Sequence, residues 1–410
     1  MAELKGACIF GQSGGPTSVI NASAAGVLQE ALKQDCITAV YGAAHGIKGI
    51  LDEIFYDISK EDQFELDLLK TTPSSALGSC RYKLKNADDD DTDYKRLLEV
   101  FQKYNIRYFF YNGGNDSMDT CNKVSKYMQK VGYDCRVMGV PKTIDNDLYG
   151  TDHCPGYGSA AKYIATSFME VYHDARVYDN GMVTVLEVMG RNAGWLTAAS
   201  ALAAYKGNGP DLIYLPELDF NMEQFLSDVE RIYKKNNKVI VAVSEGAKLA
   251  DGRYVADSGV RDSFGHAQLG GVATTLANLV KEKLNTKVRG IEFSLLQRCA
   301  AHCGSLTDVN ESYLAGQTAV KKAVEGMTDY MVGFEREAGN EYKCNIKLLP
   351  LSSVANTEKK IPREWINKEG NFVTEDFVKY ALPLIQGESK PLMEDGLPRF
   401  AKLKKVLASK

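Results

Sequence analysis

Short apolar runs alternate along this chain with longer segments in which apolar residues recur at helical spacing. The first run covers residues 7–10, and after a glycine-rich turn a helix is predicted for 19–32. Four later runs also lead into polar clusters that contain glycine or proline: 108–111, 136–140, 183–188 and 239–243. Such β-type runs alternating with helical segments indicate βαβ units and a mainly parallel sheet. The sequence therefore predicts an α/β protein.

The polar clusters share one position relative to the predicted strands. Each follows directly after an apolar run, at the end where a parallel strand would finish. Ligands of open parallel sheets bind beyond the carboxyl ends of the strands. We therefore expect the clusters to meet in one cleft. A boundary between two parts of the chain is expected at about residues 147–158, where Gly, Asp and Pro concentrate.

Length, charge and cysteine content narrow the class of protein. The 410 residues suffice for two or three domains, or for one protein of two lobes. Against 53 Asp and Glu, the 49 Lys and Arg give a net charge of -4, which offers no general attraction to nucleic acid or to an anionic membrane. No apolar run approaches the roughly 18 residues of a membrane span, and no signal-peptide pattern opens the chain. Nine Cys without a CxxC pair favour reduced thiols and a cytoplasmic protein.

Two glycine-rich turns are candidate phosphate-binding loops. Gly14 and Gly15 lie between the first run and its helix, where backbone amides could hold a phosphate; a plain βα turn is the alternative. In the second turn, 112–117, glycines would let a ligand approach closely, and Asn115 and Asp116 offer oxygens to a metal or to a phosphate-bound water. Helix capping is the alternative there. Neither the Walker lysine pattern nor GxGxxG is present, which disfavours a P-loop ATPase and a dinucleotide enzyme.

The segment 141–147 is the most informative part of the sequence. It places Lys142, Thr143, Asp145 and Asp147 directly after a predicted strand. Alternate spacing puts the two carboxylates on one side of an extended segment, which suits a general base and an orienting or metal-associated partner. Lys142 could neutralise charge on a transferring phosphoryl group. An Asx-rich turn without chemistry is the alternative.

Three arginines and one glutamate could bind an anionic sugar. Arg191, Arg289 and Arg298 are each expected just after an apolar run, at a strand end, and guanidinium groups match pairs of phosphate oxygens. Glu245 follows the run 239–243 and could bind sugar hydroxyls. The alternatives are surface arginines and an acid at a helix N-terminus.

In this order, the clusters resemble the phosphofructokinase family. The segments that carry the resemblance span about residues 7–325: 13–15, 78–81, 113–117, 143–147, 187–191, 244–245 and 297–298. The TIDND and EVMGR segments are highly specific in combination. The resemblance implies two Rossmann-like lobes with mainly parallel sheets and an active site in the cleft between them. It implies a phosphoryl-donor lobe at residues 1–158, to which about residues 299–345 return. It also implies a sugar-phosphate lobe at 159–298 and a C-terminal extension of unassigned role at 346–410.

The resemblance also implies a reaction and a set of residue roles. A phosphoryl group is transferred to the 1-hydroxyl of fructose 6-phosphate, with Mg²⁺ as the cofactor, Asp145 as the base and Asp147 beside it in the sugar and metal site. The residues implied at the sugar phosphate are Thr143, Ile144, Asp145, Met189, Gly190, Arg191, Glu245, Arg289 and Arg298. Gly14 and Arg81 match groups around the phosphoryl donor. A neighbouring subunit usually supplies the counterpart of Arg289, which implies a homodimer.

Two positions indicate the donor. ATP-using members typically carry GGDGS and PGTIDND, whereas this chain carries GGNDS with Asp116 and PKTIDND with Lys142. The pyrophosphate-dependent branch has an acid and a lysine there, so both residues are expected to act in catalysis. A carboxylate about 4 Å from an α-phosphate would oppose it by about 4 kcal/mol at an effective dielectric of about 20. The resemblance thus implies reversible transfer from pyrophosphate, giving fructose 1,6-bisphosphate and phosphate in glycolysis or gluconeogenesis.

Alternative functions stay open at this point. One is an ATP-dependent 6-phosphofructokinase with unusual loops. Another is a catalytically silent regulatory subunit, which would have lost the loop that Lys142 and Asp145 belong to. A plain sugar-phosphate-binding module would not need Asp145. Asn115 stands where the family usually has an acidic, magnesium-associated residue, so Mg²⁺ is expected to be held by Asn115 or Asp116, water and the donor.

Overall fold

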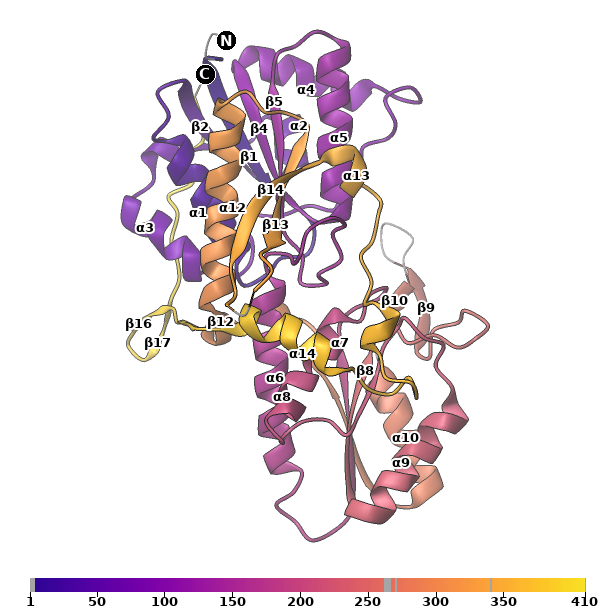
Figure 1. Cartoon of the computed structure of the whole chain (residues 1–410). Helices are drawn as coiled ribbons and strands as arrows, with labels where there is room; N and C mark the ends of the chain where they lie inside the picture. Colours follow the sequence, from indigo (N-terminus) through magenta and orange to yellow (C-terminus); the bar gives the residue numbers. More distant parts are fainter. Residues whose placement is uncertain (1–3, 262–266, 270, 340, 410) are drawn as a thin grey trace.

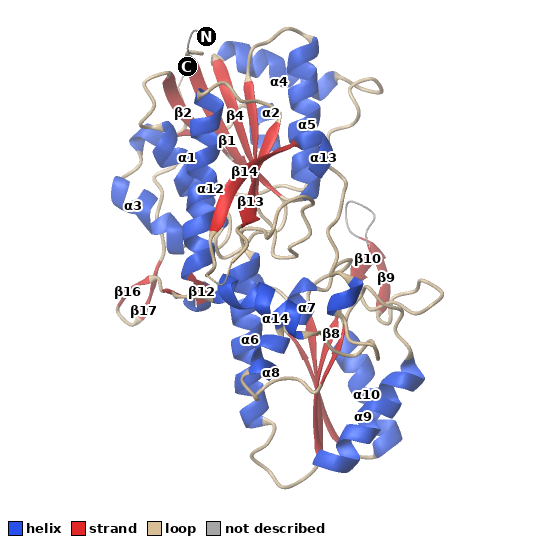
Figure 2. Cartoon of the chain, in the orientation of Figure 1, coloured by secondary structure: helices blue, strands red, loops and turns tan. Residues whose placement is uncertain are grey.

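The computed structural model has two α/β lobes, one above the other in Figure 1. It describes residues 4–261, 267–269, 271–339 and 341–409. Each lobe has a central sheet with helices on both faces (Figure 2). The predicted α/β class and the mainly parallel sheets are therefore confirmed. Within the described ranges, no helix is both long and apolar enough to cross a membrane.

The first sheet has seven strands in the order β14-β13-β5-β4-β1-β2-β3. The five strands from β13 to β2 are parallel, and β14 and β3 are antiparallel edges. Their bounds are Gly6–Gln12 (β1), Ile37–Ala43 (β2), Phe55–Asp57 (β3), Ile106–Gly113 (β4), Arg136–Pro141 (β5), Tyr330–Arg336 (β13) and Cys344–Pro350 (β14).

Side chains of β1 alternate between two layers of helices. Ala7 and Ile9 pack in a cluster with α4 and α5, whereas Cys8 and Phe10 pack with α1 and α12. A parallel strand that is covered on both faces needs apolar residues at every position, which explains its continuous apolar run. The helices of this lobe are α1 (Ile20–Ala31), α2 (Ile47–Leu51), α3 (Gln63–Leu68), α4 (Thr92–Lys103), α5 (Asn115–Lys130), α12 (Leu306–Val324) and α13 (Leu351–Val354).

The second sheet has four parallel strands in the order β11-β6-β8-β7. Helices α6, α7, α8 and α14 pack on one face, and α9 and α10 on the other. The strands are β6 (Met182–Val188), β7 (Leu212–Tyr214), β8 (Lys238–Ser244) and β11 (Lys287–Glu292). The helices are α6 (Tyr157–Asp174), α7 (Trp195–Ala199), α8 (Ala201–Tyr205), α9 (Met222–Asn236), α10 (Val272–Leu284), α11 (Leu296–Cys299) and α14 (Glu375–Ala381). Short strand pairs are β9 (Asp257–Arg261) with β10 (Ala267–Leu269), β12 (Gly304–Ser305) with β15 (Glu388–Ser389), and β16 (Leu392–Glu394) with β17 (Leu397–Arg399).

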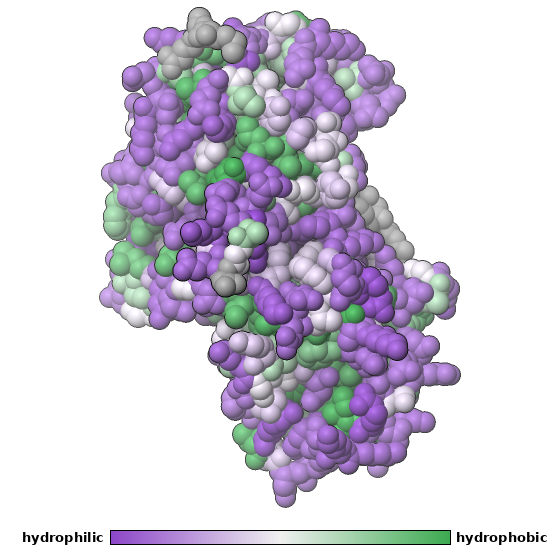
Figure 3. Space-filling model, viewed as in Figure 1, coloured by the Kyte–Doolittle hydropathy of each residue, from purple (hydrophilic) through white to green (hydrophobic). Residues whose placement is uncertain are grey.

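The chain crosses between the two sheets several times. It enters the second lobe through α6 and returns through α11 and α12 to add β13 and β14 to the first sheet. The part after β14 then runs back down, so that α14 lies at the junction of the lobes (Figure 1). It finally returns beside β3, where Ala408 N donates to Phe55 O at 2.9 Å. Hydrophilic residues cover most of the face seen in Figure 3.

All five strands expected from apolar runs are confirmed, as β1, β4, β5, β6 and β8, and the helix predicted for 19–32 is α1. In the two central sheets, the sequence pattern did not identify β2, β3, β7, β11, β13 or β14. The pattern of β11 is weak because β11 is an edge strand on which four of six residues are exposed.

Helices α1 and α12 touch backbone to backbone. A β-carbon added at Gly26 would lie 2.1 Å from Tyr313 O, and one at Gly316 would lie 2.2 Å from Ser23 O. We predict that Gly26→Ala lowers the free energy of unfolding by about 3 kcal/mol, because overpacking must push the helices apart. Gly132→Ala is the control, since an added β-carbon there meets no atom within 4 Å and only the left-handed backbone resists it, at a cost of about 1 kcal/mol. Equal losses in denaturant titrations of the two variants would contradict the prediction.

Candidate active site

The carboxyl ends of the two sheets enclose one cleft of about 600 Å³. Within the first sheet, Gln12 lies opposite Asn112, so the loops after β1 and β4 start side by side. The polar clusters expected to meet are brought together there. The sequence-predicted residues that line the cleft are Gly14, Arg81, Asn115, Asp116, Lys142, Thr143, Ile144, Asp145, Met189, Arg191, Glu245 and Arg298.

The loop after β1 brings backbone close to a cation. Gly14 has φ 76°, and a β-carbon there would lie 3.4 Å from Lys142 Nζ. Gly14 N donates to Cys80 O at 3.1 Å, and Ser79 Oγ donates to Gly14 O at 2.7 Å. These bonds tie the loop that carries Arg81 to the turn, so Arg81 and the turn line the same part of the cleft.

Helix α5 begins at the cleft with Asn115 and Asp116. Asn115 Nδ2 donates to Asp147 Oδ2 at 3.1 Å. Asn115 Oδ1 is buried and has no hydrogen-bond partner among the described residues. Asp116 is exposed in the first helical turn, where a carboxylate interacts favourably with the helix dipole.

Lys142 is withdrawn from water. Its side chain is only 3% exposed, and Nζ donates to Gly15 O at 2.5 Å. Burial lowers the pKa of Lys142 to about 8, an effect that the charge of Asp145 opposes and that of Arg298 reinforces. The ammonium group is therefore held in place beside the turn after β1.

The loop 143–147 aims its two carboxylates into the cleft. Asp145 N donates to Thr143 Oγ1 at 3.1 Å, and Asn146 adopts a left-handed backbone with φ 56°. Burial raises the pKa of Asp145 to about 6, and the charge of Glu245 adds to the rise. Burial likewise raises the pKa of Asp147 to about 7, helped by the negative charges of Asp145 and Glu358.

The opposite wall belongs to the second sheet. Gly190 N donates to Glu245 Oε1 at 3.3 Å, and burial raises the pKa of Glu245. Gly190 has φ 131° and lies behind the cleft surface rather than in its lining, next to Met189 and Arg191. Arg298 reaches toward the first lobe, because a β-carbon at Gly15 would lie 3.0 Å from Arg298 Nη1.

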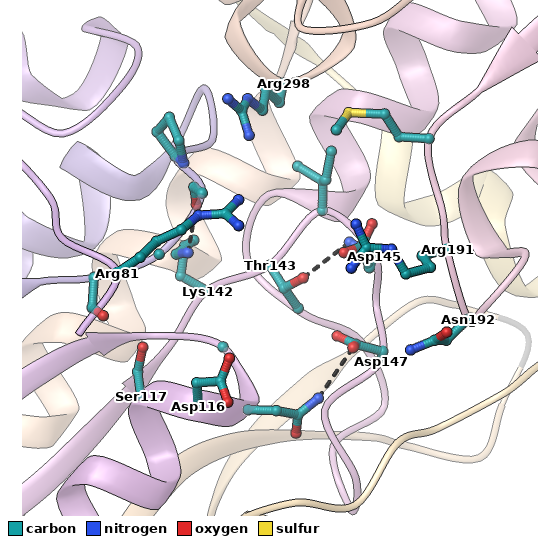
Figure 4. A pocket seen from close by; sticks show the side chains of 18 of the residues that line it. Arg81, Asp116, Ser117, Lys142, Thr143, Asp145, Asp147, Arg191, Asn192 and Arg298 are labelled. Carbon is teal, nitrogen blue, oxygen red and sulfur yellow. Dashed lines mark hydrogen bonds between the residues drawn. The ribbon is translucent and has the colours of Figure 1, made fainter. Parts of the chain in front are cut away.

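Figure 4 shows how the charges are arranged. Arg81 and Lys142 lie on one side, and Arg191 lies on the other. Asp145 lies beside Arg191, and Asp147 lies between Asp116 and the second-lobe residue Asn192. Cations from both lobes thus surround a central loop of carboxylates.

Arg289 does not join this group. The expectation that it follows a strand end is wrong, since Arg289 lies inside β11, paired with Thr184, and is exposed. The cleft lining within the described residues does not include it. The physical reason is that β11 continues to Glu292 before the chain turns back through α11, which carries Arg298.

Among the polar side chains of the cleft that sequence reasoning missed are Asn192, Asn356 and Glu358. Asn192 Nδ2 donates to Glu358 Oε1 at 2.9 Å, and Asn356 Nδ2 donates to Asp119 Oδ1 at 3.3 Å. Glu358 belongs to the C-terminal part, to which no role was assigned. Its short segment has no apolar run or glycine turn that could have marked it. Asn192 directly follows EVMGR and could have been included on that ground.

The oxygens at the start of α5 suit a hard divalent cation. Asn115 Oδ1 is an unpaired buried acceptor, and Asp147, beside it, accepts from the same amide. Mg²⁺ prefers carboxylate and amide oxygens together with water and substrate phosphates. The residues present therefore fit the ion that the sequence led us to expect.

Comparisons with known proteins identify the family. The family model described as Phosphofructokinase matches residues 8–322, so the chain belongs to the phosphofructokinase family. It is 47% identical over 400 residues to a pyrophosphate--fructose 6-phosphate 1-phosphotransferase of Halomonas elongata, covering 97% of this chain and 96% of that one. A protein of the same name from Methylococcus capsulatus is 45% identical, with 98% and 96% covered. A solved structure of a pyrophosphate-dependent phosphofructokinase from Nitrosospira multiformis superposes with a TM-score of 0.89 at 42% identity, covering 98% of both chains.

We predict that Asp147→Asn stabilises the metal-free protein at pH 8 but not at pH 4. Because the folded protein raises the pKa of Asp147 from 3.8 to about 7, it holds the proton more tightly than the unfolded chain does. That stabilisation is fully present below about pH 4 and is lost as the pH rises through 7. Removing the charge should add on the order of 4 kcal/mol to the unfolding free energy at pH 8. Denaturant titrations of wild type and Asp147→Asn at both pH values measure this change in the free energy of unfolding.

The exposed Asp395 supplies a matched control, because Asp395→Asn makes the same chemical change on the hairpin between β16 and β17. It should alter stability little at either pH. An Asp147→Asn effect that is the same at pH 4 and pH 8 would show that the carboxylate is not destabilised by burial.

Proposed function

We propose that the protein catalyses reversible phosphoryl transfer from pyrophosphate to the 1-hydroxyl of fructose 6-phosphate. The observation that carries the proposal is a buried lysine, Lys142, whose charge is favoured by the carboxylates of the adjoining loop. Lys142 is buried between the turn after β1 and Asp145, and Asp116 marks the start of α5 on the same side of the cleft. The names of the full-length relatives from Halomonas and Methylococcus support the same reaction.

In this proposal the first lobe binds the donor. The backbone at Gly14 and the side chains of Arg81 and Lys142 hold pyrophosphate, and their positive charge stabilises the charge that develops on the departing phosphate. A buried cation is more effective there than an exposed one because the local dielectric is low. Asp116 excludes a nucleoside triphosphate, since its carboxylate would lie against the α-phosphate.

The second lobe binds the sugar phosphate. Arg298 and Arg191 hold the 6-phosphate and ring oxygens, and Met189, Gly190 and Glu245 shape the hexose site. Thr143 and Ile144 complete it from the side of the loop. Asp145 takes the proton of the 1-hydroxyl while that oxygen forms a bond to the transferred phosphorus and the bridging oxygen leaves with phosphate. With a pKa near 6, Asp145 is ionised at neutral pH and still basic enough to accept a proton.

Mg²⁺ would be held by Asn115 Oδ1, Asp147, donor oxygens and water, and it would neutralise charge on pyrophosphate. By holding the ion, Asn115 and Asp147 would help to orient the donor toward the 1-hydroxyl next to Asp145. Pyrophosphate and fructose 1,6-bisphosphate can each act as the phosphoryl donor. The same groups of the protein therefore serve the reverse reaction, in which phosphate accepts the phosphoryl group.

We further propose a homodimer in the cytoplasm. Arg289 is exposed on the edge strand β11, where it is available to the sugar-phosphate site of a neighbouring copy. The nine cysteines are all free thiols in the structure, which fits a reducing compartment.

The test of the function is a steady-state assay with fructose 6-phosphate and Mg²⁺ that compares pyrophosphate with ATP. We expect pyrophosphate to give the higher kcat/KM by orders of magnitude. A wild-type enzyme that prefers ATP would refute the proposal, and binding of fructose 6-phosphate without turnover would indicate a binding module.

Asp145→Asn should lower kcat by roughly 10²–10⁴, the usual contribution of a positioned general base. Binding of fructose 6-phosphate, measured by calorimetry, should stay within a few-fold of wild type because the amide keeps the size of the side chain. If kcat stayed within threefold of wild type, another group would have to be the base.

Asp116→Gly should raise the ratio of kcat/KM for ATP over pyrophosphate at least about tenfold, because each 1.4 kcal/mol of repulsion removed is a factor of ten. Adding Lys142→Gly should raise the ratio further while total activity falls. Asp119→Asn is the control, since Asp119 lies about one turn later on α5 and pairs with Lys123 at 2.7 Å. A ratio that moves equally in the control, or not at all in the Asp116 variant, would place donor selection elsewhere.

A further inference from the structure

Asn146 separates the two carboxylates of the catalytic loop and points the opposite way. It is fully buried, and its backbone is left-handed, with φ 56°. Its Oδ1 accepts from Cys154 N at 2.9 Å, and its Nδ2 donates to the hydroxyl of Tyr380 at 2.8 Å. Because Asn146 lies between the two acids, the bonds that fix its side chain also fix the backbone from which Asp145 and Asp147 extend.

The Tyr380 hydroxyl links this loop to the next one. It accepts a hydrogen bond from Asn146 and donates one to Asp152 O at 2.7 Å. The hydroxyl therefore uses its proton and one lone pair to hold two points of the loop 143–152. Tyr380 lies more than two hundred residues further along the chain, on α14. A second tether comes from the same C-terminal part, where Lys359 N donates to Asp147 O at 2.7 Å.

The ring of Tyr380 is itself held rigidly. It packs against Trp195 and Trp365, each with ring centroids 5.3 Å away. The guanidinium of Arg336 lies 4.8 Å above the ring and donates from Nη1 to Tyr380 O at 3.0 Å. Residues of both lobes therefore fix Tyr380 independently of its bond to Asn146.

We propose that Tyr380 is a positioning residue for the reaction, which acts through Asn146 to aim Asp145 and Asp147 into the cleft. The C-terminal part would then belong to the catalytic machinery although Tyr380 lies outside the lining of the cleft. The inference rests on the proposed function, because only that function makes Asp145 the base. Misplacement of a reacting group by about 1 Å can cost on the order of a hundredfold in rate.

Tyr380→Phe tests the proposal because it keeps the ring and removes only the hydroxyl. We expect kcat with pyrophosphate to fall roughly 10–100-fold, while KM for fructose 6-phosphate and for pyrophosphate stays within about threefold. Tyr157→Phe is the matched control: Tyr157 is buried in the same core cluster, and its hydroxyl donates to Trp195 O at 3.3 Å, outside the loop. The control should keep kcat within about threefold. Equal losses of kcat in both variants would show that Tyr380 only contributes to stability in general, and would overturn the proposal.

A double-mutant cycle separates positioning from packing. Asn146→Ala removes the other side of the same bond, so Tyr380→Phe in that background should lower kcat by no more than about twofold further. Fully multiplied losses would overturn the inference. If Tyr380→Phe fails to fold, Asn146→Ala alone still tests the bond, and a kcat within about threefold of wild type would overturn the inference.

Hydrogen exchange distinguishes failure of this inference from failure of the proposed function. Amides of residues 145–152 should exchange at least about tenfold faster in Tyr380→Phe than in wild type or in Tyr157→Phe. That result does not require turnover, so it would survive even if wild type proved inactive with pyrophosphate. Unchanged exchange in this segment would refute the anchoring whatever the activity.

Discussion

The structure depends on keeping charged groups of both signs together where little water reaches them. Lys142, Asp145 and Asp147 lie where the two sheets meet, and burial pushes each of them toward its neutral form. The attraction between Lys142 and Asp145 offsets part of that cost, but the two carboxylates repel each other. A loop with this composition would relax toward solvent if only its own bonds held it. The rest of the fold must therefore hold this loop in its buried position.

Three separate parts of the chain provide that support. The loop continues a strand of the first sheet, Lys142 N donates to Gly113 O at 3.0 Å, and Thr143 N donates to Pro155 O at 3.1 Å. The C-terminal part adds hydrogen bonds from the side facing away from the cleft. Since this part packs on the second lobe through α14, the position of the loop is coupled to the relative position of the two lobes. Arg298, which extends from the second lobe toward Gly15, spans the same junction.

The sequence predicts the central strands β1, β4, β5, β6 and β8, and the cleft, because each leaves a local signal. Continuous apolar runs mark strands buried on two faces, and their polar ends mark the cleft, so Lys142 and Asp145 could be placed from the sequence. Edge strands such as β11 are half exposed and carry no such run, which is why Arg289 was placed wrongly. Glu358 and Tyr380 reach the loop only after the chain has built the first sheet and crossed back. Contacts between positions more than two hundred residues apart have no expression in a local pattern.

In the proposed function, Asp116 and Lys142 serve one donor specificity, but they differ in what they cost the fold. Asp116 is exposed in the first turn of α5, where the helix dipole favours a carboxylate. Its charge therefore costs the fold nothing, and the fold does not depend on it. Lys142 is buried, and its charge is stabilised by the bond to Gly15 O and by the negative charge of Asp145. Loss of Lys142 would leave Asp145 with less opposing charge and raise its pKa further, which couples donor binding to the base. Exclusion of a nucleotide at Asp116 is thus a surface property of one helix turn, whereas use of pyrophosphate is built into the core of the site.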